Sequence, residues 1–175
     1  MTHPTVRRLS ALDETQIAAL AHVLLDCVED GASVSFMPPL SIDRARAFWR
    51  GLAAGVAHGE RALLVAEDAT GAIVGTVQVV LAQPENQPHR ADVAKMLVHR
   101  RARRVGLGAA LMRAAERVAA GEGMTLLVLD TASSAAERLY QREGWQRCGV
   151  IPGFALLPHG GLCATTVFFK ALPAG

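Results

Sequence analysis

The chain has 175 residues, 51% of them hydrophobic, and a formal net charge of +2. We therefore expect residues 1–175 to form a single domain with a substantial core, and the small net charge argues against nucleic acid as a partner. No apolar run is long enough for a membrane span, and residues 1–8 lack the apolar stretch of a secretory signal, which predicts a cytoplasmic protein without a membrane partner.

Hydrophobic spacing and turn residues predict the elements of the first half of the chain. Asp13 is a suitable N-cap for a first helix, and Pro38 and Pro39 interrupt the chain because proline fits neither a helix interior nor an inner strand. Gly71 lies in a short link that is typical of an antiparallel hairpin. The expected elements are a strand over Thr5–Leu9, helices from Asp13 to about Val28 and from Ser41 or Asp43 to about His58, and strands over Arg61–Glu67 and Ala72–Ala82.

The second half of the chain continues the alternation of strands and helices. Ser134 and Glu137 have the spacing of a capping box, and Gly121, Gly123 and Gly144 are helix-ending residues. The order of elements predicts an α+β fold with a crossover helix. The expected elements are a strand over Ala91–His99, a helix from Gly106 to about Ala120, a strand over Met124–Leu129, a helix from Ser134 to about Glu143, and strands near Trp145–Val150 and Cys163–Lys170.

Residues 93–108 join an apolar strand, a basic bend, two glycines and the start of a helix. Gly106 and Gly108 would let the backbone turn with its N–H groups facing one point. The first N–H groups of the helix and the positive end of its dipole would face the same point. Arg103 is near enough to add a bidentate contact to a phosphate. The stretch therefore predicts a site for a pyrophosphate.

Three interpretations of this turn are open. It could be an ordinary strand-to-helix turn whose arginines face water. A dinucleotide fingerprint is disfavoured because Leu111 stands where the third glycine is needed, and a Walker loop is excluded because the chain has no Gly-Lys-Ser/Thr ending. In the third interpretation, residues 103–108 (Arg-Arg-Val-Gly-Leu-Gly) resemble the coenzyme A loop of the GNAT acetyltransferases, Arg/Gln-x-x-Gly-x-Gly/Ala.

A second segment resembles the same family. Residues 136–145 are similar to its Ala-x-x-Leu-Tyr-x-x-x-Gly-Phe stretch, although Ser133 stands where the family often has asparagine. The resemblance implies a single-domain GNAT fold, with a mixed, mostly antiparallel sheet of about seven strands and about four helices, and acetyl-CoA as co-substrate without a metal. Residues 31–37, 90–98, 129–131, 151–154 and 164–170 resemble the tabtoxin-resistance group of the family, which acetylates a toxic β-lactam amino acid.

The resemblance also implies positions that bind the coenzyme. In the family, the strand before the loop separates from its neighbour and pairs with the pantetheine arm, and the Val98 N–H is then a candidate oxyanion donor. The residues carried over to coenzyme binding are Met96, Leu97, Val98, Arg103, Arg104, Val105, Gly106, Leu107, Gly108, Ser133 and Ala136.

Three residues are candidates for proton transfer. Tyr140, the only tyrosine, lies where the family often places its general acid; alternatively, it is a helix aromatic whose hydroxyl bonds to backbone. Asp130 ends a strand near the expected acceptor entrance and could take a proton from the amine or cap the next helix. Asp92 is the second base candidate, with a solvated strand residue as the alternative. We expect His99 to face solvent at the strand end.

The remaining expectations concern the acceptor and the cysteines. Phe36, Met37 and a loop over residues 151–158 could form walls of the acceptor pocket. The three cysteines show no Cys-x-x-Cys spacing, so we expect core thiols rather than disulfides or zinc ligands. The favoured activity is direct acetyl transfer to the primary amine of a small amino-acid-like metabolite or toxin. Acetylation of a protein N-terminus or lysine, or a non-catalytic acyl-CoA-binding module, are the alternatives. Similar enzymes also suggest a homodimer.

Overall fold

The computed structural model describes residues 5–173, and Met1–Pro4, part of the segment used to argue against a secretory signal, lies outside them. Seven strands form one sheet in the order β1-β2-β3-β4-β5-β7-β6, and every neighbouring pair is antiparallel except β4 and β5. The predicted α+β fold is thereby confirmed. The strands are β1 (Thr5–Leu9), β2 (Arg61–Glu67), β3 (Ile73–Val80), β4 (Arg90–Val98), β5 (Leu126–Thr131), β6 (Gln146–Leu156) and β7 (Leu162–Ala171).

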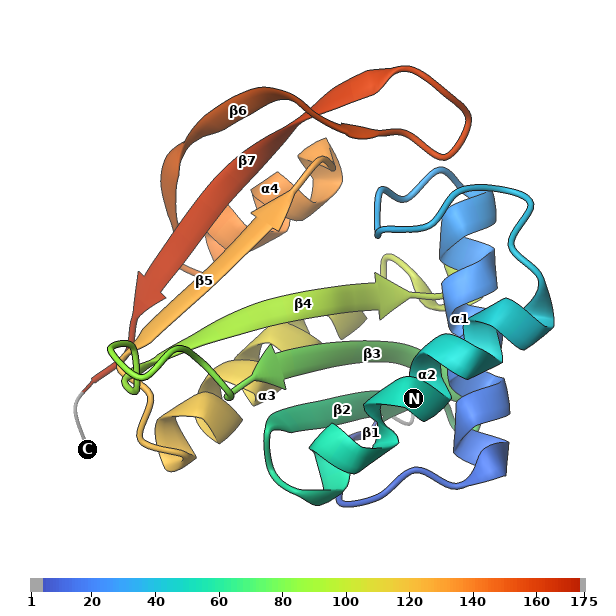
Figure 1. The fold of residues 1–175 in the computed structure, drawn as a ribbon, viewed down its shortest axis with the longest axis horizontal. Helices are drawn as coiled ribbons and strands as arrows, with labels where there is room; N and C mark the ends of the chain where they lie inside the picture. The colour runs from blue at the N-terminus through green and yellow to red at the C-terminus, as the bar shows by residue number, and fades with distance from the viewer. Residues whose placement is uncertain (1–4, 174–175) are drawn as a thin grey trace.

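Helices cover the two faces of the sheet in pairs (Figure 1). Helices α1 (Glu14–Glu29) and α2 (Ile42–Ala57) pack on one face, around the buried Trp49. Helices α3 (Leu107–Gly121) and α4 (Ser134–Arg142) pack on the other, and a short 3-10 helix, η1 (Arg100–Ala102), follows β4. Within the described residues, no helix is both long enough and apolar enough to cross a membrane.

The helix caps agree with two predictions and correct a third. Asp13 and Gln16 form a reciprocal capping box at α1, and the Ser41 hydroxyl caps α2. Helix α4 is capped by Ser133 rather than by the expected Ser134–Glu137 box. Glu137 instead accepts a hydrogen bond of 2.8 Å from Thr166 Oγ1, so contact with β7 replaces the local capping interaction.

Strands β4 and β5 separate along most of their length. They pair only where Arg90–Asp92 lies beside Leu126–Val128, and then diverge, as Figure 1 shows. On its other side β4 has a bulge, because its pairing with β3 shifts between Ala94 and Leu97. Lys95 lies in this bulge with φ of 51°. The gap between β4 and β5 beyond the paired residues is called the split below.

The expected loop over residues 151–158 is largely strand. β6 continues to Leu156 through Pro152 and Gly153, with an irregularity in its register between Ile151 and Ala155. Proline and glycine suggest a loop, but both are tolerated at a bulge on an edge strand, and β6 is the edge of this sheet. The turn after β6 reaches α1, where His159 Nε2 lies 3.0 Å from the Glu29 carbonyl oxygen.

Candidate active site

The loop between η1 and α3 presents a row of free backbone donors. Among the described residues, none accepts a hydrogen bond from the N–H groups of residues 104–108. Arg104 and Gly106 have φ of 64° and 81°, so the loop turns twice through the left-handed region. A Cβ built on Gly106 would meet nothing within 4 Å, so the loop is open above this position. Free amides at the positive end of α3 suit an anionic phosphate group.

Arg103 does not share this role. Its N–H is bonded to the Arg100 carbonyl oxygen at 3.3 Å. Its guanidinium is directed at α1, where Nη1 pairs with Asp30, and Nε donates to the Val98 carbonyl oxygen at 2.9 Å. The predicted phosphate contact of Arg103 is therefore replaced by contacts that hold the loop against α1.

The other arginines of the run also divide by partner. Both the backbone N–H and Nε of Arg100 donate to Asp26 at 2.8 Å, and Arg101 pairs with Asp68 at 3.0 Å. Burial alone would raise the pKa of Asp26, but the two Arg100 donors outweigh burial and hold that pKa below its ordinary value. Arg104 makes no ion pair or hydrogen bond to another described side chain. It is thus the arginine of the loop that remains available to a ligand.

This division gives a testable prediction. Arg104→Met should weaken acetyl-CoA binding, with a smaller salt dependence than the wild type shows, while leaving the melting temperature near the wild-type value. Arg103→Met should mainly lower stability, by about 1–2 kcal/mol for the lost hydrogen bonds of a partly exposed group. Calorimetry at two salt concentrations and thermal melts separate the two effects. Equal losses of affinity in both variants would contradict this assignment.

Gly108 and Ser133 have structural partners. Gly108 lies inside α3, and a Cβ there would come within 3.0 Å of Leu139 Cδ2, so this glycine permits close packing of α3 on α4 rather than the turn. The Ser133 hydroxyl accepts from the Ala136 N–H at 3.3 Å, and the Ser133 N–H donates to Thr131 Oγ1 at 3.1 Å. The Ser133 hydroxyl and the Ala136 N–H, which were predicted to bind the coenzyme, therefore bond to each other as the N-cap of α4.

At the end of β4, the Val98 N–H is free to bind a ligand, whereas the Val98 carbonyl oxygen is not. The His99 N–H bonds to the Val74 carbonyl oxygen at 2.9 Å, so by antiparallel alternation the Val98 N–H points away from β3. The Val98 carbonyl oxygen is occupied by Arg103 and by Cys27 Sγ at 3.6 Å. His99 Nδ1 lies 3.5 Å from Asp26 and its side chain is 28% exposed, so it faces solvent only in part.

Tyr140, on α4, belongs to the core on the α3–α4 side of the sheet. Its ring is buried, 5% exposed, and packs against Trp145 and Phe168 at centroid distances of 6.1 and 5.7 Å. The hydroxyl bonds to none of the described residues, so the alternative of a backbone-bonded hydroxyl is not observed. Burial, reinforced by the negative charge of Asp130, raises the pKa of Tyr140 to about 12. The phenol therefore stays protonated at neutral pH and can act only as a proton donor there.

This shift predicts the pH titration of the only tyrosine. Rapid pH jumps followed by ultraviolet absorbance should give a tyrosinate midpoint near 12 in the folded chain, against the ordinary value of 10 in denaturant. Because the folded pKa lies above the unfolded one, this contribution to stability is complete below pH 10 and is lost as the pH rises to about 12. A folded-state midpoint at 10 would contradict the burial of the hydroxyl.

The two carboxylate candidates lie at opposite ends of β4–β5. Asp130 is exposed at the open end of the split, accepts a hydrogen bond of 2.6 Å from Thr165 Oγ1, and does not cap α4. Asp92 lies at the closed end, where it pairs with Arg90 and accepts from Gln83 Nε2 at 3.1 Å. Asp130 is therefore the carboxylate whose position suits proton transfer, since Asp92, at the closed end of the split, is already held by Arg90 and Gln83.

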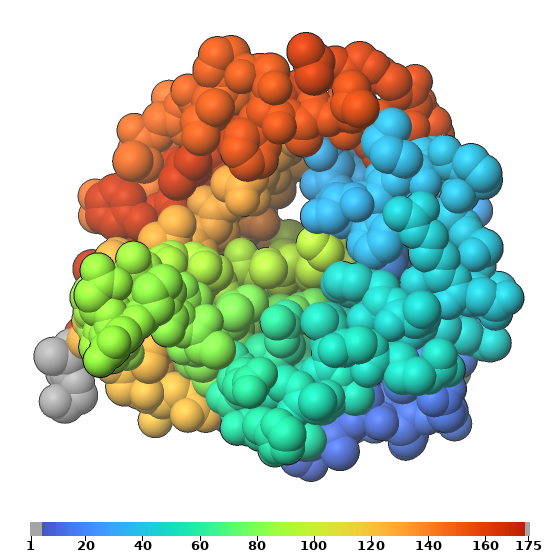
Figure 2. Space-filling model, in the orientation of Figure 1, coloured from blue at the N-terminus to red at the C-terminus, as the bar shows by residue number. Residues whose placement is uncertain are grey.

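A hollow opens on the α1–α2 side of the split. Figure 2 shows it between the light-blue segment after α1, the yellow-green end of β4 and the orange β6–β7 hairpin. The hairpin touches the segment after α1 at a second place, where Cys163 Sγ lies 3.9 Å from Ser33 Oγ. Phe36 stacks edge-on against Phe48 with centroids 5.1 Å apart, whereas Met37 is exposed. Of the cysteines only Cys27 is buried, so Cys148, which is exposed, is not the expected core thiol.

Sequence reasoning missed two groups beside this hollow. One is Lys95, which donates to Ser35 Oγ at 3.2 Å. Its place in an apolar strand, in a chain with only two lysines, is a sequence signal that could have identified it. Asp26 supports the loop from within the apolar stripe of α1, and the sequence gives no local signal for this partnership.

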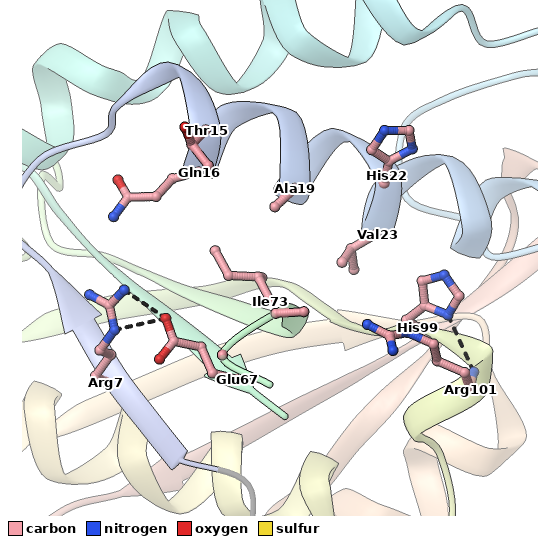
Figure 3. Close-up of a pocket in the computed structure, with 12 residues that line it drawn as sticks. Arg7, Thr15, Gln16, Ala19, His22, Val23, Glu67, Ile73, His99 and Arg101 are labelled. Carbon is pink, nitrogen blue, oxygen red and sulfur yellow. Dashed lines mark hydrogen bonds and ion pairs between the residues drawn. The ribbon is translucent and has the colours of Figure 1, made fainter. Parts of the chain in front are cut away.

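A separate groove of about 380 Å³ lies between α1 and the β2–β3 turn (Figure 3). Two pairs of its lining groups bond to each other: Arg7 pairs with Glu67 at 2.6 Å, and the Arg101 N–H donates to His99 Nδ1 at 3.3 Å. The groove contains none of the residues predicted to bind coenzyme or to transfer protons. It is therefore distinct from the candidate active site.

A sequence model of the acetyltransferase (GNAT) domain matches residues 59–147, which include the split, the 104–108 amides and Tyr140. The chain belongs to the GNAT acetyltransferase family. Acetyl transfer from acetyl-CoA is the activity of this family, and the free amides of the loop fit the diphosphate of that co-substrate.

Solved structures share the fold of this GNAT chain. An N-acetyltransferase from Staphylococcus aureus Mu50 is 15% identical with a TM-score of 0.80, over 98% of this chain and 100% of that one. A ribosomal-protein-alanine N-acetyltransferase from Brucella melitensis is 19% identical with a TM-score of 0.79, over 96% and 99%. A GNAT superfamily phosphinothricin acetyltransferase from Sinorhizobium meliloti, in complex with acetyl-CoA, is 16% identical with a TM-score of 0.79, over 98% and 89%. The names of these neighbours span protein and small-molecule acceptors.

Proposed function

We propose that this enzyme transfers acetyl from acetyl-CoA directly to the primary amine of a small amino-acid-like metabolite or toxin. The observation that carries the choice of acceptor is the contact of the β6–β7 turn with α1, His159 Nε2 to the Glu29 carbonyl oxygen at 3.0 Å. This contact and that of Cys163 with Ser33 hold the hairpin against α1 and the segment after it, and so bound the hollow on that side (Figure 2). The likeness to the tabtoxin-resistance group and to a phosphinothricin acetyltransferase supports the same class of acceptor.

In the proposed reaction the N–H groups of residues 104–108 and the Arg104 side chain hold the diphosphate. The Val98 N–H, directed away from β3, stabilises the carbonyl oxygen that becomes negative during attack. Asp130 takes the proton from the attacking amine, directly or through water. As the new C–N bond forms and the C–S bond breaks, Tyr140 gives its proton to the leaving thiolate. Asp92 has no part in this scheme because Arg90 already holds it.

Acetylation of a protein N-terminus is the second candidate, and the fold shared with a ribosomal-protein-alanine N-acetyltransferase is the observation in its favour. A non-catalytic acyl-CoA-binding module is less well supported. Tyr140 lies close enough to Asp130 for the carboxylate to raise the pKa of the phenol, which supports a role for the pair in transfer.

A screen of acceptors by release of coenzyme A tests the proposal. The panel contains free amino acids, their carboxamides, simple alkylamines, and short peptides with free N-termini or lysines. We expect turnover with small amines to exceed turnover with every peptide. Turnover confined to peptides would favour the second candidate, and acetyl-CoA binding without turnover on any acceptor would favour the non-catalytic module.

A further inference from the structure

Lys95 occupies an unusual position on β4. It lies in the bulge, where the strand leaves its regular pairing with β3, and its φ of 51° is in the left-handed region. A residue with a Cβ rarely adopts this backbone conformation, and residues strained in this way are found more often at functional sites. The ammonium group of Lys95 lies on the α1–α2 side of the sheet, where Nζ donates to Ser35 Oγ at 3.2 Å and lies 5.8 Å from the centre of the Phe48 ring.

The partner of Lys95 is strained in the same way. Ser35 has φ of 77°, and among the described residues only Ser35, Lys95 and Arg104 combine a side chain with a positive φ. Arg104 belongs to the loop that holds the diphosphate in the proposed function. The other two are joined by the Lys95–Ser35 hydrogen bond, which supports a role for this contact in binding.

The ammonium group is partly buried without a carboxylate partner. Among the described residues no acidic group lies within ion-pair distance of Lys95, whereas the other lysine, Lys170, pairs with Glu116 at 2.8 Å. Burial lowers the pKa of Lys95, and the charge of Asp130 acts in the opposite direction. The charge of Asp130 therefore raises the pKa of Lys95 from the other strand that borders the split, but the two groups do not form an ion pair.

We propose that Lys95 and Asp130 together select a zwitterionic acceptor, with Lys95 binding its carboxylate and Asp130 receiving its ammonium group. This inference rests on the proposed function and narrows it: the acceptor carries a carboxylate close to the amine that is acetylated. Because Lys95 and Asp130 do not neutralise each other in an ion pair, each can meet the opposite charge of one ligand. Phe48 and Ser35 orient the ammonium group of Lys95 in this role.

Matched acceptors and variants test this inference. Each amino acid that is turned over is compared with its carboxamide, in wild type and in Lys95→Met, Lys95→Gln and Lys95→Arg. The ratio of wild type to variant for one acceptor cancels the different basicity of the two amines. Loss of a charge-assisted contact predicts that Lys95→Met raises KM for the amino acid roughly ten- to a hundredfold more than for its carboxamide. Lys95→Arg should recover part of this difference.

A second readout needs no variant. With lysine labelled at the ε-carbon, the chain gives two side-chain signals, and Lys170 is an internal control. Addition of an amino-acid acceptor to the enzyme with coenzyme A should shift the Lys95 signal, and its carboxamide should not. Equal KM changes for both acceptors, or an unmoved Lys95 signal, would overturn this inference and leave the proposed function standing. Failure of every small amine with the wild type would overturn both.

Discussion

Gly106→Trp is expected to abolish useful binding of acetyl-CoA, with a loss of affinity of roughly a hundredfold or more. Gly106 has φ of 81° and open space where its Cβ would be, so the indole would fill the approach to the free N–H groups of residues 104–108. Loss of two charge-assisted hydrogen bonds, each of about 1.5–3 kcal/mol, already accounts for this factor. Isothermal titration calorimetry with acetyl-CoA measures it directly.

The same helix supplies the control. Gly123, just past the other end of α3, has φ of 80° and equally open surroundings. Gly123→Trp therefore carries the same backbone strain, of order 1–2 kcal/mol, without reaching the loop. We expect it to lower the melting temperature about as much as Gly106→Trp does, while acetyl-CoA binds as in the wild type. If both variants lose affinity equally, the loop is not where the diphosphate binds.

Tyr140→Phe should lower kcat by about a hundredfold or more, the contribution expected of a positioned general acid. Acetyl-CoA affinity should stay within about twofold of the wild-type value, because the ring remains against Trp145 and Phe168. The affected step is protonation of the leaving thiolate, and a phenol whose pKa is raised to about 12 still carries its proton at neutral pH. Single-turnover rates measured with saturating acetyl-CoA isolate this step.

The variant also has an internal control for folding. The Tyr140 hydroxyl bonds to none of the described residues, so its removal leaves no buried partner unsatisfied. The free energy of unfolding at pH 7 should therefore change little. A wild-type kcat in Tyr140→Phe would remove the residue from the mechanism, whereas a large loss of stability would show that the hydroxyl has a structural partner.

Local features of the site could be predicted from the sequence, and contacts between distant segments could not. The turn at Gly106 follows from glycine at a strand-to-helix junction, and the caps at Asp13 and Ser41 follow from residue type. By contrast, Arg103 looks like a phosphate ligand until α1 brings Asp30 beside it. Gly108 looks like a turn residue until the approach of Leu139 shows that it serves helix packing.

Two other differences have the same origin. Pro152 and Gly153 suggest a loop, and only their place on the outermost strand shows why β6 can include them. Lys95 reads as an ordinary strand residue until the bulge and its contact with Ser35 are known. Hydrophobic spacing determines which face of an element is buried, but it does not determine which charged groups meet once the layers have assembled.

The contact between His159 and the Glu29 carbonyl closes the chain into a ring around the hollow of Figure 2. An open groove would select ligands by their length, whereas a closed ring selects them by their cross-section. Under the proposed function, a small amine passes this ring whole, whereas a peptide would have to thread its main chain and first side chains through it unless the hairpin lifts from α1. We therefore expect the range of acceptors to depend on this contact between two segments that are distant in the sequence.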